Sequence, residues 1–128
     1  MELKLESGPI LINPSIEEIA NVLPFEGFAI ISENLESMSF MQFCKSRKKG
    51  LALEYQVDSL ENHFTATSVS LTMEGIVLAF QKYAQGDASW RSDFQWQQWE
   101  KINLKGRETI LSPGWAEKFR KNPPRVIE

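Results

Sequence analysis

The chain has 128 residues, of which 42% are hydrophobic and 24% are charged, and its formal net charge is −3. This length predicts a single domain over residues 1–128, which can bury enough apolar surface to fold without a metal or a disulfide. The single cysteine, Cys44, excludes an intramolecular disulfide framework and a multi-cysteine zinc site. The single histidine, His63, excludes a metal site built on two histidines, so we expect no metal. The charge balance favours neither intrinsic disorder nor a basic domain that binds nucleic acid.

The ends and apolar runs of the chain predict its compartment. Residues 1–6 lack the basic region and apolar core of a secretory signal. The apolar runs at 28–31 and 75–80 are much shorter than the ~20 residues that span a bilayer. A lone thiol agrees with a reducing compartment, so we expect a cytoplasmic protein without a membrane partner. No glycine-rich phosphate loop occurs in the sequence, and we expect no cofactor.

The first predicted element is a helix over residues 13–23. Ser15 and Glu18 have the spacing of a capping box, in which each side chain accepts a hydrogen bond from a free backbone N–H. Four apolar residues then fall on one helix face: Ile16, Ile19, Ala20 and Leu23. Pro24 ends the helix because its ring clashes with a further turn, and the β-rich residues 28–31 predict a short buried strand.

Residues 38–67 predict a three-stranded antiparallel meander. Its strands are expected at 38–45, 51–57 and 62–67, and the polar loop at 46–50 joins the first two. Apolar and polar residues alternate along 51–57, which is the period of a half-buried strand.

Residues 72–85 show the clearest helical pattern in the chain. An apolar stripe runs along it, formed by Met73, Ile76, Val77, Phe80, Tyr83 and Ala84. Ser70 or Thr72 is expected to cap its start, and Gly86 stands where a left-handed residue is needed at its end. Gly75 lowers helix stability by about 1 kcal/mol relative to Ala, which close packing on the sheet would explain.

Residues 94–102 fit neither a strand nor a helix completely. Phe94 and Trp96 alternate with glutamines as in a strand, whereas Trp99 breaks this alternation. We favour a strand with a bulge near 97–98.

A short C-terminal helix is expected to begin at Pro113, with Ser112 as its N-cap and with Trp115 and Phe119 four residues apart. The predicted strands cluster in the middle of the chain instead of alternating with helices. The fold class is therefore α+β, with a mainly antiparallel sheet, two main helices packed on one face and the short C-terminal helix.

Polar side chains are expected on one face of the meander. If the second and third strands pair, Glu54, Gln56, His63 and Thr65 share a face, and a histidine within reach of a carboxylate can act as a general base. The alternative is an exposed face that carries ordinary polar residues. We favour this alternative because antiparallel sheets commonly show one face to water.

Cys44 follows Phe40 and Gln42 on one strand face, and the strand phases allow contact with His63, as a cysteine nucleophile would require. No signature of a cysteine hydrolase surrounds it. A free cysteine is more often a small buried hydrophobe, so we assign no catalytic residue.

An aromatic segment is the most unusual feature of the sequence. Trp90, Phe94, Trp96 and Trp99 fall within ten residues, beside Arg91. Tryptophan and arginine dominate the hot spots of protein interfaces. The alternative is that the aromatic rings close one end of the core, which we favour because large aromatics in a small domain are usually buried.

Charge is distributed unevenly along the chain. Residues 1–37 hold seven acids and one base, whereas residues 105–128 hold six bases and three acids. An acidic surface can steer a basic partner and raise its association rate. Pairing of the two ends within the molecule, or plain solvation, is the simpler interpretation. The three basic residues at 47–49 are too few to indicate nucleic acid.

Part of the chain, at about 28–99, resembles small bacterial proteins with the arrangement strand, turn, strand, helix and G-D-x-x-W. The segments that carry the resemblance are 53–56, 62–64, 71–83, 86–87, 90–91 and 94–96. In size and layout these proteins are similar to the immunity proteins that neutralise bacterial polymorphic toxins. The resemblance implies cytoplasmic binding without catalysis, and it implies no functional residues.

The leading hypothesis is a non-enzymatic cytoplasmic module that binds a protein, as an immunity-type inhibitor or as a subunit of a homodimer. The candidate binding residues of its aromatic anchor are Trp90, Arg91, Trp96 and Trp99. The rival hypothesis is a small-ligand-binding domain or an enzyme that uses the polar sheet face. It requires a concave pocket that contains Glu54, Gln56 and His63, walled by Trp96. A third possibility is a purely structural accessory module, which no feature of the sequence distinguishes from the first hypothesis. None of the three includes a nucleic acid or a membrane as partner.

Overall fold

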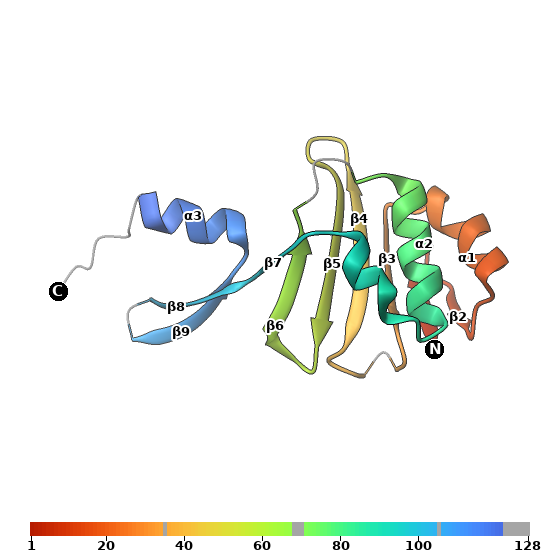
Figure 1. Cartoon of the computed structure of the whole chain (residues 1–128), viewed down its shortest axis with the longest axis horizontal. Helices are drawn as coiled ribbons and strands as arrows, with labels where there is room; N and C mark the ends of the chain where they lie inside the picture. Colours follow the sequence, from red (N-terminus) through yellow and green to blue (C-terminus); the bar gives the residue numbers. More distant parts are fainter. Residues whose placement is uncertain (35, 68–70, 105, 122–128) are drawn as a thin grey trace.

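The centre of the molecule is an antiparallel sheet, which has seven strands among the residues that the computed structural model describes (1–34, 36–67, 71–104 and 106–121). The strand order is β2-β1-β3-β4-β5-β6-β7 (Figure 1). The strands are β1 (Glu2–Leu5), β2 (Ile10–Ile12), β3 (Phe28–Ser32), β4 (Phe40–Ser46), β5 (Gly50–Val57), β6 (Ser59–Ala66) and β7 (Trp96–Gln98). Each neighbouring pair is antiparallel, which confirms the predicted α+β class and the predicted kind of sheet.

Two helices, α1 (Ile16–Val22) and α2 (Met73–Ala84), pack against each other and cover one face of the sheet, as predicted (Figure 1). The capping box of α1 is present. The Glu18 N–H donates to Ser15 Oγ at 3.1 Å, and the Ser15 N–H donates to Glu18 Oε1 at 3.0 Å. The chain then turns through the short 3₁₀ helix η1 (Leu23–Phe25), which contains Pro24. Ile19 is buried, whereas Ile16 and Ala20, expected on the same face, are exposed.

Thr72 is the cap of α2, since its Oγ1 accepts a hydrogen bond from the Gly75 N–H at 3.0 Å. The other predicted cap, Ser70, lies outside the described residues. Gly86 follows the helix with φ of 72°, the left-handed conformation that glycine adopts without steric cost. The chain continues into the 3₁₀ helix η2 (Ala88–Asp93), which contacts α2 and was not predicted.

The core lies between the sheet and these helices. Alternate residues of β4 and β5 point into it, and their register pairs Met41 with Tyr55 and Phe43 with Leu53. The ring of Phe43 meets that of Phe80 on α2 edge to face, with centroids 5.7 Å apart. The predicted meander is therefore confirmed, and α2 shields its apolar face.

Two strands at the N-terminus were not predicted from the sequence. β1 pairs with both β2 and β3, and its Leu3 and Leu5 are buried. The strands have four and three residues, which is too short for a periodic pattern to emerge. Their addition makes β2 one edge of the sheet.

The chain leaves the sheet after β7 and forms an arm (Figure 1). The arm consists of β8 (Glu100–Leu104), β9 (Arg107–Leu111) and α3 (Pro113–Lys121), where β8 and β9 form a separate two-stranded sheet. The single strand predicted over 94–102 was wrong, because the chain changes sheets at Trp99 and not at a bulge near 97–98. The C-terminal helix begins at Pro113 as predicted, while the side chain of Phe119 lies outside the described part of the structure.

Candidate functional site

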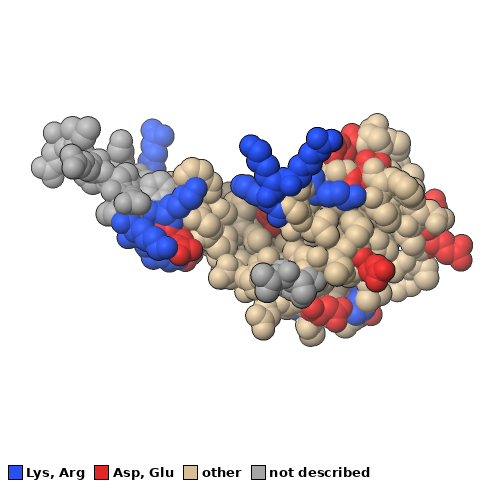
Figure 2. Space-filling view, turned by 90° about the horizontal axis from the view of Figure 1, so that it is seen from above, with Lys and Arg blue, Asp and Glu red and all other residues tan. Residues whose placement is uncertain are grey.

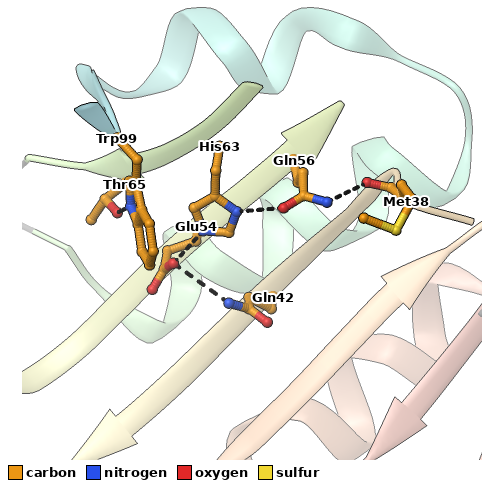
Figure 3. Close-up of polar contacts among 7 residues, drawn as sticks. All are labelled: Met38, Gln42, Glu54, Gln56, His63, Thr65 and Trp99. Carbon is orange, nitrogen blue, oxygen red and sulfur yellow. Dashed lines mark hydrogen bonds and ion pairs between the residues drawn. The ribbon is translucent and has the colours of Figure 1, made fainter. Parts of the chain in front are cut away.

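Three residues of the polar cluster predicted on the meander, Glu54, Gln56 and His63, are joined by close polar contacts, whereas the fourth, Thr65, bonds to Trp99 (Figure 3). The register of β5 and β6 places His63 opposite Gln56 and Thr65 opposite Glu54. His63 Nε2 lies 2.6 Å from Glu54 Oε1, and His63 Nδ1 lies 3.0 Å from Gln56 Oε1. Gln42 on β4 adds a longer contact, with its Nε2 3.5 Å from Glu54 Oε1.

The hydrogen-bond partners assign protons to His63. The Gln56 amide Nε2 donates to the Met38 carbonyl at 2.8 Å, which leaves Gln56 Oε1 to face His63 Nδ1 as an acceptor. His63 Nδ1 therefore carries a proton. His63 Nε2 faces a carboxylate oxygen, so a second proton must lie between this nitrogen and Glu54. In this state both ring nitrogens of His63 have a hydrogen-bond partner.

His63 is shielded from solvent. Its exposed fraction is 3%, because the ring of Trp99 lies over it with centroids 4.3 Å apart and the edge of Phe40 approaches at 6.0 Å. The Trp99 Nε1–H donates to Thr65 Oγ1 at 2.7 Å, which holds the indole in place. The prediction of an exposed polar face was therefore wrong for His63, and its ring nitrogens are occupied. A buried, saturated histidine joins strands and does not offer a free base to a substrate.

The tryptophans of the aromatic segment mostly pack at one end of the core, as predicted by the interpretation that we favoured. Trp90 is 4% exposed and packs edge to face on Tyr55 with centroids 4.8 Å apart. Trp96 is half-buried on the same tyrosine at 4.7 Å, and its Nε1–H donates to the Arg91 carbonyl at 2.9 Å. Together with Trp99, these indoles close one end of the sheet instead of forming one exposed anchor.

Arg91 is the member of the aromatic segment that reaches solvent. Its guanidinium carbon lies 5.4 Å from the Tyr55 ring centroid and 5.3 Å from the Trp90 centroid, in cation–π contact with both. Among the described residues, no carboxylate lies within ion-pair distance of this guanidinium.

A cavity of about 400 Å³ opens beside Arg91. It lies where the ends of β3 and β5 meet η2 and the end of α2, and its lining includes the charged or hydroxyl-bearing side chains of Glu33, Ser37, Ser39, Asp58, Tyr83 and Arg91. Burial raises the pKa of the Tyr83 hydroxyl, the Glu33 carboxylate raises this pKa further and Arg91 lowers it. No sequence pattern predicted the acidic residues and Tyr83 as site residues, since they come from loops and a helix end that only folding brings together.

The pocket that the rival hypothesis placed at His63 is not this cavity. Two further cavities are lined by Gln97 and residues of the arm, and by Asn62 with residues around Trp99. None of the three includes Glu54, Gln56 or His63 in its lining.

Cys44 is exposed, so the prediction that it is a buried small hydrophobe was wrong. It pairs with Ala52 on β5 and with Phe28 on β3. His63 instead lies level with Gln56 and Phe40, at the other end of β4. The register therefore separates the thiol from the histidine.

Four large apolar side chains between residues 10 and 25 are exposed, two of them on the edge strand β2 and two in the helical segment that follows it. The exposed fractions are 47% for Ile10, 63% for Ile12, 44% for Ile16 at the start of α1 and 87% for Phe25 in η1. We call these four side chains the β2 edge. Acidic residues of the same part of the chain accompany it: Glu6, Glu17, Glu18 and Glu26.

Within the described part of the chain, no helix is long and apolar enough to cross a membrane. In the same residues, no three side chains of His, Cys, Asp or Glu come together as metal ligands. Searches against protein-family models, curated proteins and solved structures find no match for this chain.

Proposed function

We propose that the protein is a non-enzymatic interaction module that binds a basic partner protein through the β2 edge, as an immunity-type inhibitor would. The observation that carries this proposal is the exposure of Ile10, Ile12, Ile16 and Phe25, four large apolar side chains within sixteen residues of sequence. Several large apolar side chains exposed in one segment are more than a soluble surface needs, and such exposure is typical of protein-binding sites.

The strand at this edge supports docking of another chain. β2 pairs only with β1 among the described strands, so its outer side has no neighbour in the sheet. Unpaired strand edges readily accept another protein, and natural edges usually carry charges that prevent this. The edge side chains Ile10 and Ile12 are apolar, and Pro9 and Pro14 keep the strand short. Apolar side-chain contact, more than strand addition, would therefore provide the affinity.

Charge selects the partner. Figure 2 shows acidic side chains at the end of the body away from the arm, whereas basic side chains gather on the arm and over the middle of the view. Ser7 Oγ donates to Glu26 Oε1 at 2.5 Å, which ties the turn before β2 to the end of η1 and keeps Glu26 beside Phe25. Two copies that met through this edge would bring like charges together, so a homodimer through it is disfavoured and a basic partner is favoured.

The mechanism is steric occlusion without catalysis. Acidic side chains steer the partner, and the exposed apolar residues displace water from its surface. The buried network at His63 supports this assignment, because the chain's one histidine already has a partner at each ring nitrogen.

The test is recovery of a stoichiometric partner from the organism that encodes the chain, with matched variants. Phe25→Ser and Ile12→Ser are expected to weaken the complex by about tenfold or more each, since loss of a buried large apolar side chain costs about 1.5–3 kcal/mol. Leu78→Ser and Leu60→Ser, which are similarly exposed elsewhere, are the controls and should bind as the wild type does.

Two further outcomes decide the proposal. Salt should slow association, because it screens the charges that steer the partner. Glu17→Lys should slow association more than Glu74→Lys, because Glu17 is adjacent to the exposed Ile16 whereas Glu74 lies in the first turn of α2. An acidic partner, or a partner lost equally in the control variants, contradicts the proposal.

A further inference from the structure

We propose that the cavity beside Arg91 binds a small zwitterion of the α-amino-acid class, whose carboxylate meets Arg91 and whose ammonium group meets Glu33 and Asp58. This site is separate from the β2 edge, because its lining residues lie between 33 and 91 and include none of the four edge side chains. The proposed ligand site therefore does not depend on the proposed function, and each can be tested without the other.

The guanidinium of Arg91 is positioned to bind an anion. Its guanidinium is fixed over the rings of Tyr55 and Trp90, and its carbonyl accepts the hydrogen bond of the Trp96 indole. A guanidinium has five N–H donors in a rigid fork that matches a carboxylate. No hydrogen bond from these donors to a described residue is present, so a ligand carboxylate would meet unused donors.

Two carboxylates line the same cavity as Arg91. Glu33 has no ion pair or hydrogen bond within the described part of the chain. Asp58 is positioned by Ser39, whose Oγ donates to Asp58 Oδ1 at 3.2 Å and accepts from the Asp58 N–H at 2.9 Å. These contacts leave Asp58 Oδ2 as an acceptor. Asp58 also has φ of 65°, a left-handed conformation that directs the tight turn between β5 and β6.

Tyr83 lines the same cavity as both charges. The Glu33 carboxylate raises the pKa of the Tyr83 hydroxyl and the Arg91 guanidinium lowers it. The hydroxyl makes no hydrogen bond to another described residue and can bond to a ligand. The buried Trp90 adds an aromatic wall against which the aliphatic part of a ligand can pack.

Charge and size restrict the class of ligand. A purely anionic ligand such as phosphate would face two carboxylates, and a simple amine would leave Arg91 unpaired. A zwitterion satisfies both sets of charges. The volume of about 400 Å³ suits a small molecule. The two carboxylates exceed the one guanidinium, which favours an amino acid with a basic side chain.

The experiment is a titration of the ¹⁵N-labelled protein with L-arginine, followed by its amide and indole signals. We expect shifts at Glu33, Asp58 and the Trp90 indole. Agmatine lacks the carboxylate and N-acetyl-L-arginine lacks the ammonium group. Each should bind at least about tenfold more weakly than L-arginine, since each loses a charge-assisted contact.

Variants of the chain assign the contacts. Arg91→Gln should weaken L-arginine at least about tenfold and make agmatine and L-arginine nearly equal. Glu33→Gln should weaken L-arginine and leave N-acetyl-L-arginine less affected. Arg47→Gln in the β4–β5 hairpin and Glu74→Gln on α2 remove the same charges elsewhere and should change nothing. Arg91→Lys keeps the positive charge but lacks the planar pair of N–H donors. It replaces Arg91→Gln in the titration if that variant does not fold, and it should also weaken L-arginine.

Three results would overturn the proposal. The first is no signal change up to about 10 mM L-arginine, a concentration that detects a Kd of about 1 mM. The second is equal affinity for L-arginine and agmatine in the wild type. The third is an affinity for L-arginine that neither Arg91→Gln nor Arg91→Lys reduces.

Discussion

At the scale of single residues, His63 shows how hydrogen-bond geometry decides a role. Its two ring nitrogens face Gln56 Oε1 and Glu54 Oε1, which are both acceptors in the state described above. The Trp99 ring packs edge to face against the His63 ring and shields it from solvent. A polar group in such a place stabilises the fold when every partner is present and is costly when one is removed.

We therefore predict that His63→Leu lowers the free energy of unfolding by about 2–4 kcal/mol, because Glu54 and Gln56 lose their donor in a largely buried place. Urea unfolding measures this change. The double variant His63→Leu with Glu54→Leu should recover part of the loss, since removing both partners leaves no unpaired carboxylate.

Nitrogen NMR of the His63 ring checks the proton assignment directly. Nδ1 should be protonated, and Nε2 should be protonated or share its proton with Glu54. A ring with a proton on Nε2 alone contradicts the network. An unfolding free energy that does not change in His63→Leu would contradict the structural role of His63.

At the scale of elements, α2 combines a cap with a tight packing contact. Thr72 caps the helix through the Gly75 N–H, and a Cβ added at Gly75 would lie 3.2 Å from Thr72 Oγ1. Alanine at this position therefore has a higher helix propensity than glycine, but its Cβ makes a tight contact with the capping hydroxyl of Thr72. Phe94 lies 3.9 Å from the same point, which is ordinary contact.

We predict that Gly75→Ala changes the stability of the wild type little. In the Thr72→Ala background, which itself costs about 1 kcal/mol, the same substitution should gain up to about 1 kcal/mol. A double-mutant cycle in urea measures the difference. Equal gains in both backgrounds would show that Thr72 does not limit the site.

The elements with clear periodic patterns were also the ones that the sequence predicted. The apolar stripe of α2 and the alternating apolar residues of β5 supply the residues that these elements bury in the core. The period of the sequence therefore predicts which face of each element packs on the core. β1, β2 and β9 were missed, because strands of three to five residues carry too little pattern and are identified by the partner they pair with.

At the scale of the whole molecule, the arm differs from the body. Within the arm, α3 packs on β8 and β9, and Ala116 is buried there among the described side chains. One contact to the body is the ion pair between Lys101 Nζ and Glu61 Oε1, at 3.2 Å on exposed side chains. Such a pair adds little stability.

We therefore expect the amides of β8, β9 and α3 to exchange with solvent much faster than those of β4, β5 and β6. Their opening free energy should be below about 3 kcal/mol, against the 5–15 kcal/mol typical of global unfolding. Native-state hydrogen exchange measures both. Equal protection in the arm and the body would mean that they unfold as one cooperative unit.

The sequence alone determined the features that depend on neighbouring residues. The Ser15 and Glu18 cap, the helix at α2, the meander and the α+β class all follow from local spacing and hydrophobic period. Even the grouping of His63 with Glu54 and Gln56 followed from strand phase, because residues two apart on paired strands share a face.

Only the tertiary structure decided what these residues face. The fold placed Trp99 over His63, Trp90 in the core, and Glu33, Asp58 and Arg91 around one cavity. The physical reason is that burial and convergence depend on contacts between segments distant in the chain, and a periodic pattern reports only which face of an element is apolar.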